Sequence, residues 1–195
     1  MTAPSRSFWA LAGGRVHLSH RAIAQGIKDA DPRHLHTLML DFPVSSSLNN
    51  TNWLPILGLN ASYTYWPTYA QVLADYNRTN FLPTFMAEAH YEFENLYNAY
   101  GSPEVLRRQA YWSLLSGACG QFMGNHFTWQ FLAGWQTNMD TVGSLQMANV
   151  KSLFESRRWY DLVPDQSHTL VTVGFGTFAT SGSLTNNNYA TVART

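Results

Sequence analysis

Nearly continuous apolar runs recur along the first two thirds of this chain, separated by segments in which apolar residues form a single stripe. Such runs are typical of strands that are buried on both faces, because polar residues do not alternate with the apolar ones. They predict five strands, at residues 7–13, 35–41, 56–66, 82–89 and 120–126.

The segments between these runs have helical spacing. Leu18 and Ile27 fall on one stripe, which ends before Pro32. Ser102 and Pro103 are a capping residue and a first-turn proline, and they predict the start of another helix. Helices are predicted to begin near residues 18, 69, 103 and 145. Strands that alternate with helices imply a parallel sheet covered by helices, so the predicted class is α/β.

The composition changes near Asp165. From Thr169 onward the chain is rich in Gly, Ser, Thr and Asn and has no helical stripe. This composition is typical of a β-rich module. We therefore predict two domains, at 1–165 and at 166–195, of which the second is the start of a β-rich domain.

Composition and charge narrow the functional classes. The chain has 195 residues, of which 45% are hydrophobic and 12% charged, so it is expected to fold around a core. Lys plus Arg and Asp plus Glu number 12 each, which predicts neither a nucleic-acid partner nor a membrane partner. No apolar window of about 18 residues is present, and the first residues lack the apolar segment of a secretory signal. The sequence does not assign a location.

Metal and thiol chemistry are not favoured. His34 and His36 are two residues apart on a predicted strand, but no third ligand falls at a suitable spacing. Cys119 has no partner for a disulfide or a metal cluster, and the prediction for it is a buried, inert thiol. We expect neither a metal nor a cofactor.

Polar and aromatic side chains gather where the predicted strands end. In a parallel α/β barrel these ends carry the chemistry. Aromatic rings stack on the C–H faces of sugars, while amides, imidazoles and carboxylates form hydrogen bonds with sugar hydroxyls. The residues at these ends, which include Trp129 and Trp135 after the last strand, therefore predict a glycan-binding cleft.

Four stretches of the sequence carry a resemblance to a known family: DPRHLHT, SYTYWPTYAQVLADYNRTNFLPTFMAEAHYEFE, PEVLRRQAYWSLLSGACGQFMGNH and ESRRWYDLVPDQ. They resemble the apiosidase-like glycoside hydrolases, a bacterial family, over nearly the whole chain. The resemblance implies a (β/α)8 TIM barrel followed by a small C-terminal β-domain. A complete barrel needs about 250 residues. The resemblance therefore implies a truncated barrel with strands 4 to 8 and the beginning of the β-domain.

The resemblance also implies a role for Glu88, at the end of the predicted strand 82–89. In barrel glycosidases of this type the nucleophile ends the seventh strand and the acid/base ends the fourth. If residues 120–126 are the eighth strand, Glu88 ends the seventh. It is then the nucleophile of a retaining hydrolase. The alternative is a structural carboxylate paired with an arginine.

Nine further residues are predicted to contact the substrate: His36, Tyr63, Tyr65, Trp66, His90, Tyr91, Asn125, His126 and Trp129. His36 is either a sugar contact or a core imidazole, and alternation along a strand buries some of residues 63–66. His90 and Tyr91 follow Glu88 closely, and hydrogen bonds from such residues would orient a nucleophile and lower its pKa.

The acid/base is the point at which this sequence departs from the family. The family carries an aspartate just after the strand that corresponds to FWALAGG, and this sequence has Arg15 there. Arginine cannot act as the acid, because its pKa stays above about 12. Asp41 is a nearby substitute, although a loop or capping role also explains it.

Two hypotheses of different classes follow. One is a glycoside hydrolase that acts on a plant or bacterial glycan, and the other is a non-catalytic carbohydrate-binding remnant that lacks the acid. The expected partner is an oligosaccharide or polysaccharide. An incomplete barrel exposes unpaired strand edges, which predicts self-association.

Overall fold

The computed structural model describes residues 8–12, 18–97 and 99–195. Its strands are β1 (Phe8–Ala12), β2 (Leu35–Met39), β3 (Val44–Ser46), β4 (Asn60–Thr64), β5 (Thr84–Glu88), β6 (Asn95–Leu96), β7 (Ala99–Tyr100), β8 (Val163–Pro164) and β9 (Ala193–Arg194). Its α-helices are α1 (Leu18–Ala30), α2 (Thr68–Tyr76), α3 (Pro103–Leu115), α4 (His126–Trp129) and α5 (Val142–Glu155). The chain is thus of mixed α/β class, and four of the five predicted strands are confirmed.

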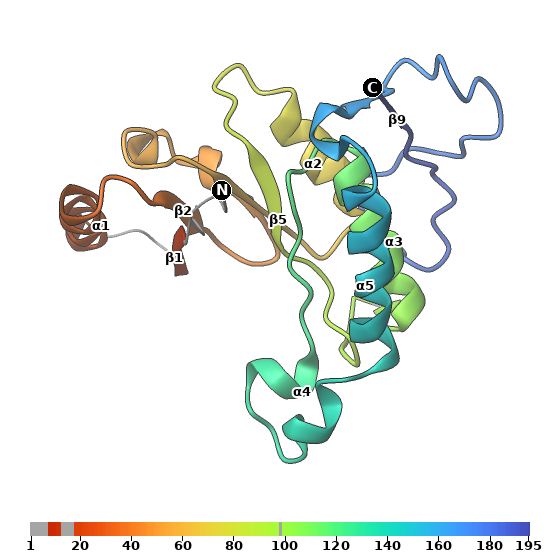
Figure 1. Cartoon of the computed structure of the whole chain (residues 1–195), viewed down its shortest axis with the longest axis horizontal. Coiled ribbons are helices and arrows are strands. Elements are labelled where there is room, and N and C mark those ends of the chain that lie inside the picture. Colours follow the sequence, from red (N-terminus) through yellow and green to blue (C-terminus); the bar gives the residue numbers. More distant parts are fainter. Residues whose placement is uncertain (1–7, 13–17, 98) are drawn as a thin grey trace.

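The longer strands run parallel. β1 pairs with β2, and β4 pairs with β5, while the short β3 adds to β4 in the antiparallel direction. The two sheets meet where the amides of Gly58 and Leu59 donate to the carbonyl of His36 at 2.9 and 3.2 Å. Within the described residues these strands form an open arrangement and no closed barrel (Figure 1).

The predicted strand at 120–126 is present only as a short contact with β5. Met86 and Gln121 form a single parallel bridge, with Met86 N donating to Gly120 O and Phe122 N donating to Met86 O, both at 3.0 Å. Gly120 and Gly124 flank this point, and glycine weakens strands because it brings no side chain to pack. The prediction of a full fifth strand is therefore wrong, although the segment follows β5 in the expected direction.

One side of β4 and β5 is covered by α2. α2 packs on β4 and β5, and Val72 of α2 is buried with Met86 of β5. α3 and α5 lie side by side (Figure 1) and enclose Ala110, Val150 and Phe154. The predicted start of α3 is confirmed, since Ser102 caps it by accepting from Val105 N and Pro103 lies in the first turn.

The C-terminal segment packs on the same helices. Trp112 Nε1 of α3 donates to Tyr189 O at 3.1 Å, and Tyr189 and Leu184 are buried with Tyr69 of α2. Within 166–195 only β9 is a strand, and it pairs with β8. The division into domains at residue 165 stays a prediction.

Among the described residues, none of the helices has the length and apolar character needed to cross a membrane.

Candidate active site

A β-bulge in β5 sets the direction of the Glu88 side chain. In a regular strand Glu88 would face the same side as Met86, which is fully buried in the layer that packs on α2. The register shifts at this point, so that Ser62 pairs with Met86 whereas the next residue, Tyr63, pairs with Glu88. Ala87 is the extra residue of a β-bulge, and bulges re-aim side chains in this way. Glu88 is thereby turned toward the face of the sheet that lies away from α2.

Glu88 lines a cavity on that face. The cavity measures about 170 Å³, and both Ala87 and Glu88 contribute to its wall. The remaining wall residues come from β2, β4, β5 and the segment after α3: Thr37, Met39, Ala61, Phe85 and Phe122. The carboxylate therefore stands at the end of β5 beside a mostly apolar cavity.

Three tyrosine hydroxyls surround the carboxylate of Glu88. Tyr65 Oη donates to Glu88 Oε1 at 3.3 Å. Tyr63 and Tyr91 also act on Glu88, because hydrogen bonding from their hydroxyls lowers the pKa of its carboxyl group. β4 and its continuation supply Tyr63 and Tyr65, and the loop after β5 supplies Tyr91. These partners are tyrosines, not the arginine of a structural ion pair.

The protonation of this group follows from burial. Desolvation raises the pKa of Glu88 above its ordinary value, and the charge of Glu94 raises it further, while the tyrosine hydrogen bonds oppose the rise. Burial and the two carboxylates also raise the pKa of Tyr63, Tyr65 and Tyr91. The three hydroxyls therefore stay protonated and act as donors at neutral pH.

Glu94 is a second carboxylate of the site. Its Oε2 accepts from Tyr91 N at 3.2 Å, and its Oε1 lies 3.5 Å from Tyr65 Oη. A hydroxyl has a single proton to donate. Tyr65 is therefore shared between Glu88 and Glu94, and the two carboxylates are coupled through it.

His90 connects the residues around Glu88 to neighbouring elements. It is buried, its backbone N–H donates to Gln109 Oε1 at 2.9 Å, and its ring Nε2 lies 3.0 Å from Leu96 O. The ring of His90 lies 5.5 Å from that of Tyr65. His90 thus links α3, the β6–β7 hairpin and Tyr65.

Trp66 belongs to an aromatic group at the rim of the site. It is partly buried, and its ring lies 4.6 Å from that of Tyr97. Phe42 lies 5.9 Å from Tyr97 and 5.2 Å from Tyr65. The structure thus brings Trp66 together with two aromatic residues that the sequence did not single out, Phe42 and Tyr97.

The loop that begins at Asn125 reaches the site through Trp129. Trp129 is 56% exposed, and its ring lies edge-on to Tyr91 at 6.0 Å. Asn125 is buried and caps α4, since its Oδ1 accepts from Phe127 N at 2.9 Å. His126 is the first residue of α4 and is partly exposed. Of these three predicted substrate contacts, only Trp129 has a described ring contact with one of the tyrosines around Glu88.

Glu92 fixes this loop to the segment after β5. This residue is 1% exposed, and its Oε1 accepts from Gly143 N at 2.9 Å. Its Oε2 accepts from Asn125 Nδ2 at 3.3 Å and from Thr141 Oγ1. Glu92 therefore accepts hydrogen bonds from donors at the start of α5 and does not line the cavity beside Glu88.

Neither His36 nor Asp41 lines the cavity beside Glu88. His36 is near the amino end of β2, is buried, and has its Nε2 3.4 Å from Asp31 O, which is the environment of a core imidazole. Arg15 lies outside the described residues. Asp41 follows β2 and is exposed.

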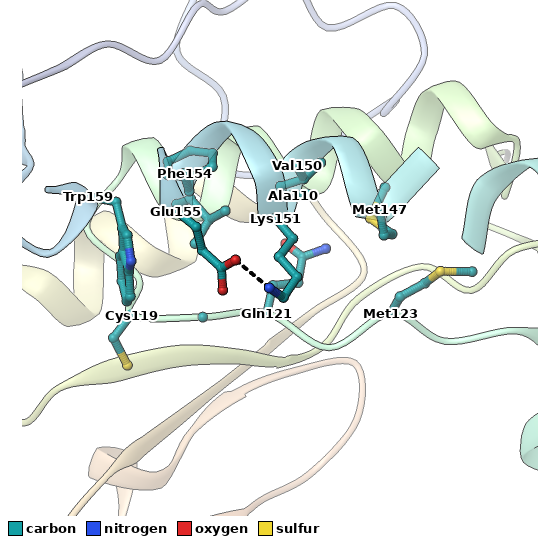
Figure 2. Close-up of a pocket in the computed structure, with 12 residues that line it drawn as sticks. Ala110, Cys119, Gln121, Met123, Met147, Val150, Lys151, Phe154, Glu155 and Trp159 are labelled. Carbon is teal, nitrogen blue, oxygen red and sulfur yellow. Dashed lines mark hydrogen bonds and ion pairs between the residues drawn. The ribbon is translucent and has the colours of Figure 1, made fainter. Parts of the chain in front are cut away.

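A larger pocket lies elsewhere, on the helix side (Figure 2). It measures about 300 Å³ and is lined by side chains of α3, α5 and the segment 119–123. Its charged residues, Lys151 and Glu155, pair with each other. Cys119 lines this pocket and is exposed, so the prediction of a buried thiol is wrong. Among the described residues no group of three or more His, Cys, Asp or Glu side chains could hold a metal ion.

Comparison with known proteins adds the family. A family model described as "Apiosidase-like, catalytic domain" matches residues 4–161. The chain belongs to this family. The resemblance seen in the sequence is thereby confirmed, and the match extends across β1 to α5. Among curated proteins no significant match is found.

Solved structures support the fold of this apiosidase-like chain. One is titled "Glycoside hydrolase", with 22% identity and a TM-score of 0.67, and the match covers 75% of this chain and 41% of that one. Another is a glycoside hydrolase family 5 protein from Bacteroides vulgatus ATCC 8482, with 23% identity and a TM-score of 0.68, covering 75% of this chain and 40% of that one. At this identity the likeness shows the fold alone. The chain spans about two fifths of the length of these proteins.

Proposed function

We propose that this chain carries the nucleophile half of a retaining glycoside hydrolase, and that Glu88 is the nucleophile. The observation that carries the proposal is the β5 bulge, which turns a carboxylate at a strand end toward a mostly apolar cavity, where three tyrosine hydroxyls interact with it. Membership of the apiosidase-like family supports a carbohydrate substrate. The parallel strands are then part of a (β/α)8 barrel, to which residues 166–195 add the start of a further domain.

The arrangement suits a covalent mechanism. An oxygen of ionised Glu88 bonds to the anomeric carbon while the bond from that carbon to the leaving oxygen breaks, and the leaving oxygen takes up a proton. Water then attacks the glycosyl ester, gives up a proton, and releases the sugar and the Glu88 carboxylate. The tyrosines hold the carboxylate in place and oppose the effect of burial on its pKa.

Protonation of the leaving group needs a separate acid. The residue at the family's acid position is Arg15, which cannot serve. Glu94 is the other carboxylate in contact with the tyrosines of the site, but Tyr65 and Tyr91 separate it from Glu88. Aryl glycosides, whose phenol leaves without protonation, therefore separate the role of the nucleophile from that of the acid.

The test is hydrolysis of a panel of aryl glycosides by the wild-type chain, Glu88→Gln and the control Glu104→Gln. Glu104 is an exposed carboxylate in α3, paired with Arg108. We expect aryl glycosides to be cleaved by the wild type and the control and not by Glu88→Gln. Natural linkages are expected to be cleaved far more slowly. Turnover that survives in Glu88→Gln would remove Glu88 from the chemistry.

The second candidate is a carbohydrate-binding remnant. Arg15 in place of the family's aspartate favours it, because the aromatic rim can hold a sugar without cleaving it. Binding of oligosaccharides without turnover of any aryl glycoside would establish this alternative.

A further inference from the structure

Three aromatic rings at the rim of the site form a cluster that we name the aromatic shelf: Phe42, Trp66 and Tyr97. Phe42 follows β2, Trp66 follows β4 and Tyr97 lies in the turn between β6 and β7, so three separate segments converge here. The planes of Phe42 and Tyr97 lie within 25° of each other at a centroid distance of 5.9 Å. Phe42 is 51% exposed and Tyr97 is 37% exposed, so part of each residue is open to solvent.

Leaving large apolar rings in water is unfavourable, and an exposed group of them usually marks a binding surface. The backbone of Tyr97 adds a second cost, because its φ is 51°. A bulky residue rarely adopts the left-handed region, and such strain collects at ligand contacts. The turn is nonetheless held in place, since His90 Nε2 lies 3.0 Å from the carbonyl of the preceding residue, Leu96.

The shelf is continuous with Glu88. Phe42 packs edge-on against Tyr65, with centroids 5.2 Å apart, and Tyr65 Oη donates to Glu88 Oε1 at 3.3 Å. A single side chain, Tyr65, therefore separates the shelf from the carboxylate. Burying an exposed ring against a C–H surface releases water and is favourable by the hydrophobic effect.

We propose that the aromatic shelf is a subsite that binds a sugar residue of an oligosaccharide next to the residue held at Glu88, through stacking of its C–H face on Phe42 and Tyr97. The subsite rests on the proposed function for its neighbour at Glu88. It extends that function, because it assigns an oligosaccharide, not a simple glycoside, as the preferred ligand. Tyr97 and Phe42 are then specificity residues that contact the substrate away from the bond that is cleaved.

Tryptophan fluorescence tests the subsite, since Trp66 is in contact with Tyr97. The chain is titrated with xylo-, cello- and galacturono-oligosaccharides of increasing length, and the same is done with Phe42→Ala and Tyr97→Asn. Asparagine tolerates a positive φ, so this variant removes the ring without backbone strain. The matched control is Tyr100→Ala, because Tyr100 is 51% exposed on the same hairpin and lies outside the shelf.

We expect at least one series to bind with an affinity that rises with length, and we expect Phe42→Ala and Tyr97→Asn to weaken that binding by about tenfold. Tyr100→Ala should bind as the wild type does, and Tyr97→Asn should unfold at the same or a higher denaturant concentration because strain is relieved. Wild-type affinity in Tyr97→Asn, or an equal loss in Tyr100→Ala, would overturn the subsite. A loss of stability in Tyr97→Asn without a loss of binding would make the shelf a packing element.

The outcome separates the two proposals. If Glu88→Gln abolishes aryl glycoside turnover while the shelf variants bind normally, the subsite fails and the hydrolase stands. If no glycoside is cleaved but the shelf variants lose binding, the hydrolase fails and the subsite stands as a carbohydrate-binding surface.

Discussion

Replacing Glu92 by Gln tests whether this carboxylate anchors the loop that carries Trp129. The carboxylate accepts hydrogen bonds at both oxygens, from Gly143 N, Asn125 Nδ2 and Thr141 Oγ1. An amide has a single acceptor oxygen. If that oxygen stays on Gly143 N, the new NH2 group faces Asn125 Nδ2, which cannot turn because Asn125 Oδ1 caps α4.

The magnitude follows from these contacts. A hydrogen bond to a charged group contributes about 1.5–3 kcal/mol, and a buried donor left without a partner costs about 1–3 kcal/mol. We therefore expect Glu92→Gln to lower the free energy of unfolding by roughly 2–4 kcal/mol. For a chain of this length about 1 kcal/mol corresponds to roughly 2–4 °C in Tm.

Urea unfolding followed by circular dichroism measures this change. The control Glu104→Gln removes a partly exposed ion pair with Arg108, and such pairs contribute at most about 1 kcal/mol. Hydrogen exchange should also rise across residues 126–141 in Glu92→Gln. A free energy of unfolding within about 0.5 kcal/mol of the wild type, with unchanged exchange in that loop, would refute the role assigned to Glu92.

Four further results are expected. The raised pKa of Glu88 means that the folded state holds this proton more tightly than the unfolded state, so stability should fall as pH rises from the ordinary glutamate value of 4.5 through the folded pKa. In urea midpoints measured against pH, Glu88→Gln should lack this fall. Identical pH profiles for the wild type and Glu88→Gln would contradict the raised pKa. Met86→Ala should lower the free energy of unfolding by about 2–5 kcal/mol in calorimetry because Met86 is fully buried. Phe81→Ala, at an exposed position, should lower it clearly less, and equal losses of stability would argue against the core described. Trp129→Ala should reduce any sugar-induced fluorescence change more than Trp112→Phe, since Trp129 is exposed beside Tyr91 and Trp112 is buried, and equal responses would make Trp129 irrelevant to binding. The open strand arrangement predicts self-association, so light scattering that shows a monodisperse monomer at all concentrations would count against exposed edges.

Local sequence signals were sufficient for most of the secondary structure. Apolar runs predicted β2, β4 and β5, and Ser102 with Pro103 predicted the start of α3, because burial periodicity and capping act within a few residues. The same signals failed at 120–126, where apolar residues suggested a full strand. Pairing there depends on a neighbouring strand on each side, and periodicity carries no information about neighbours.

The sequence by itself determined the α/β class, the family, and the position of Glu88 at a strand end, since each of these depends on residue order and composition. Only the tertiary structure decided which carboxylate of the segment 88–94 faces the cavity. The β5 bulge depends on how β5 pairs with β4, and a shift of one residue reverses the face of a side chain. That shift turns Glu88 toward the tyrosines, whereas the carboxylate of Glu92 accepts hydrogen bonds from a segment far along the chain. The aromatic shelf likewise arises from three segments distant in sequence, and contacts of that kind follow from the packing of the whole chain and not from any local pattern.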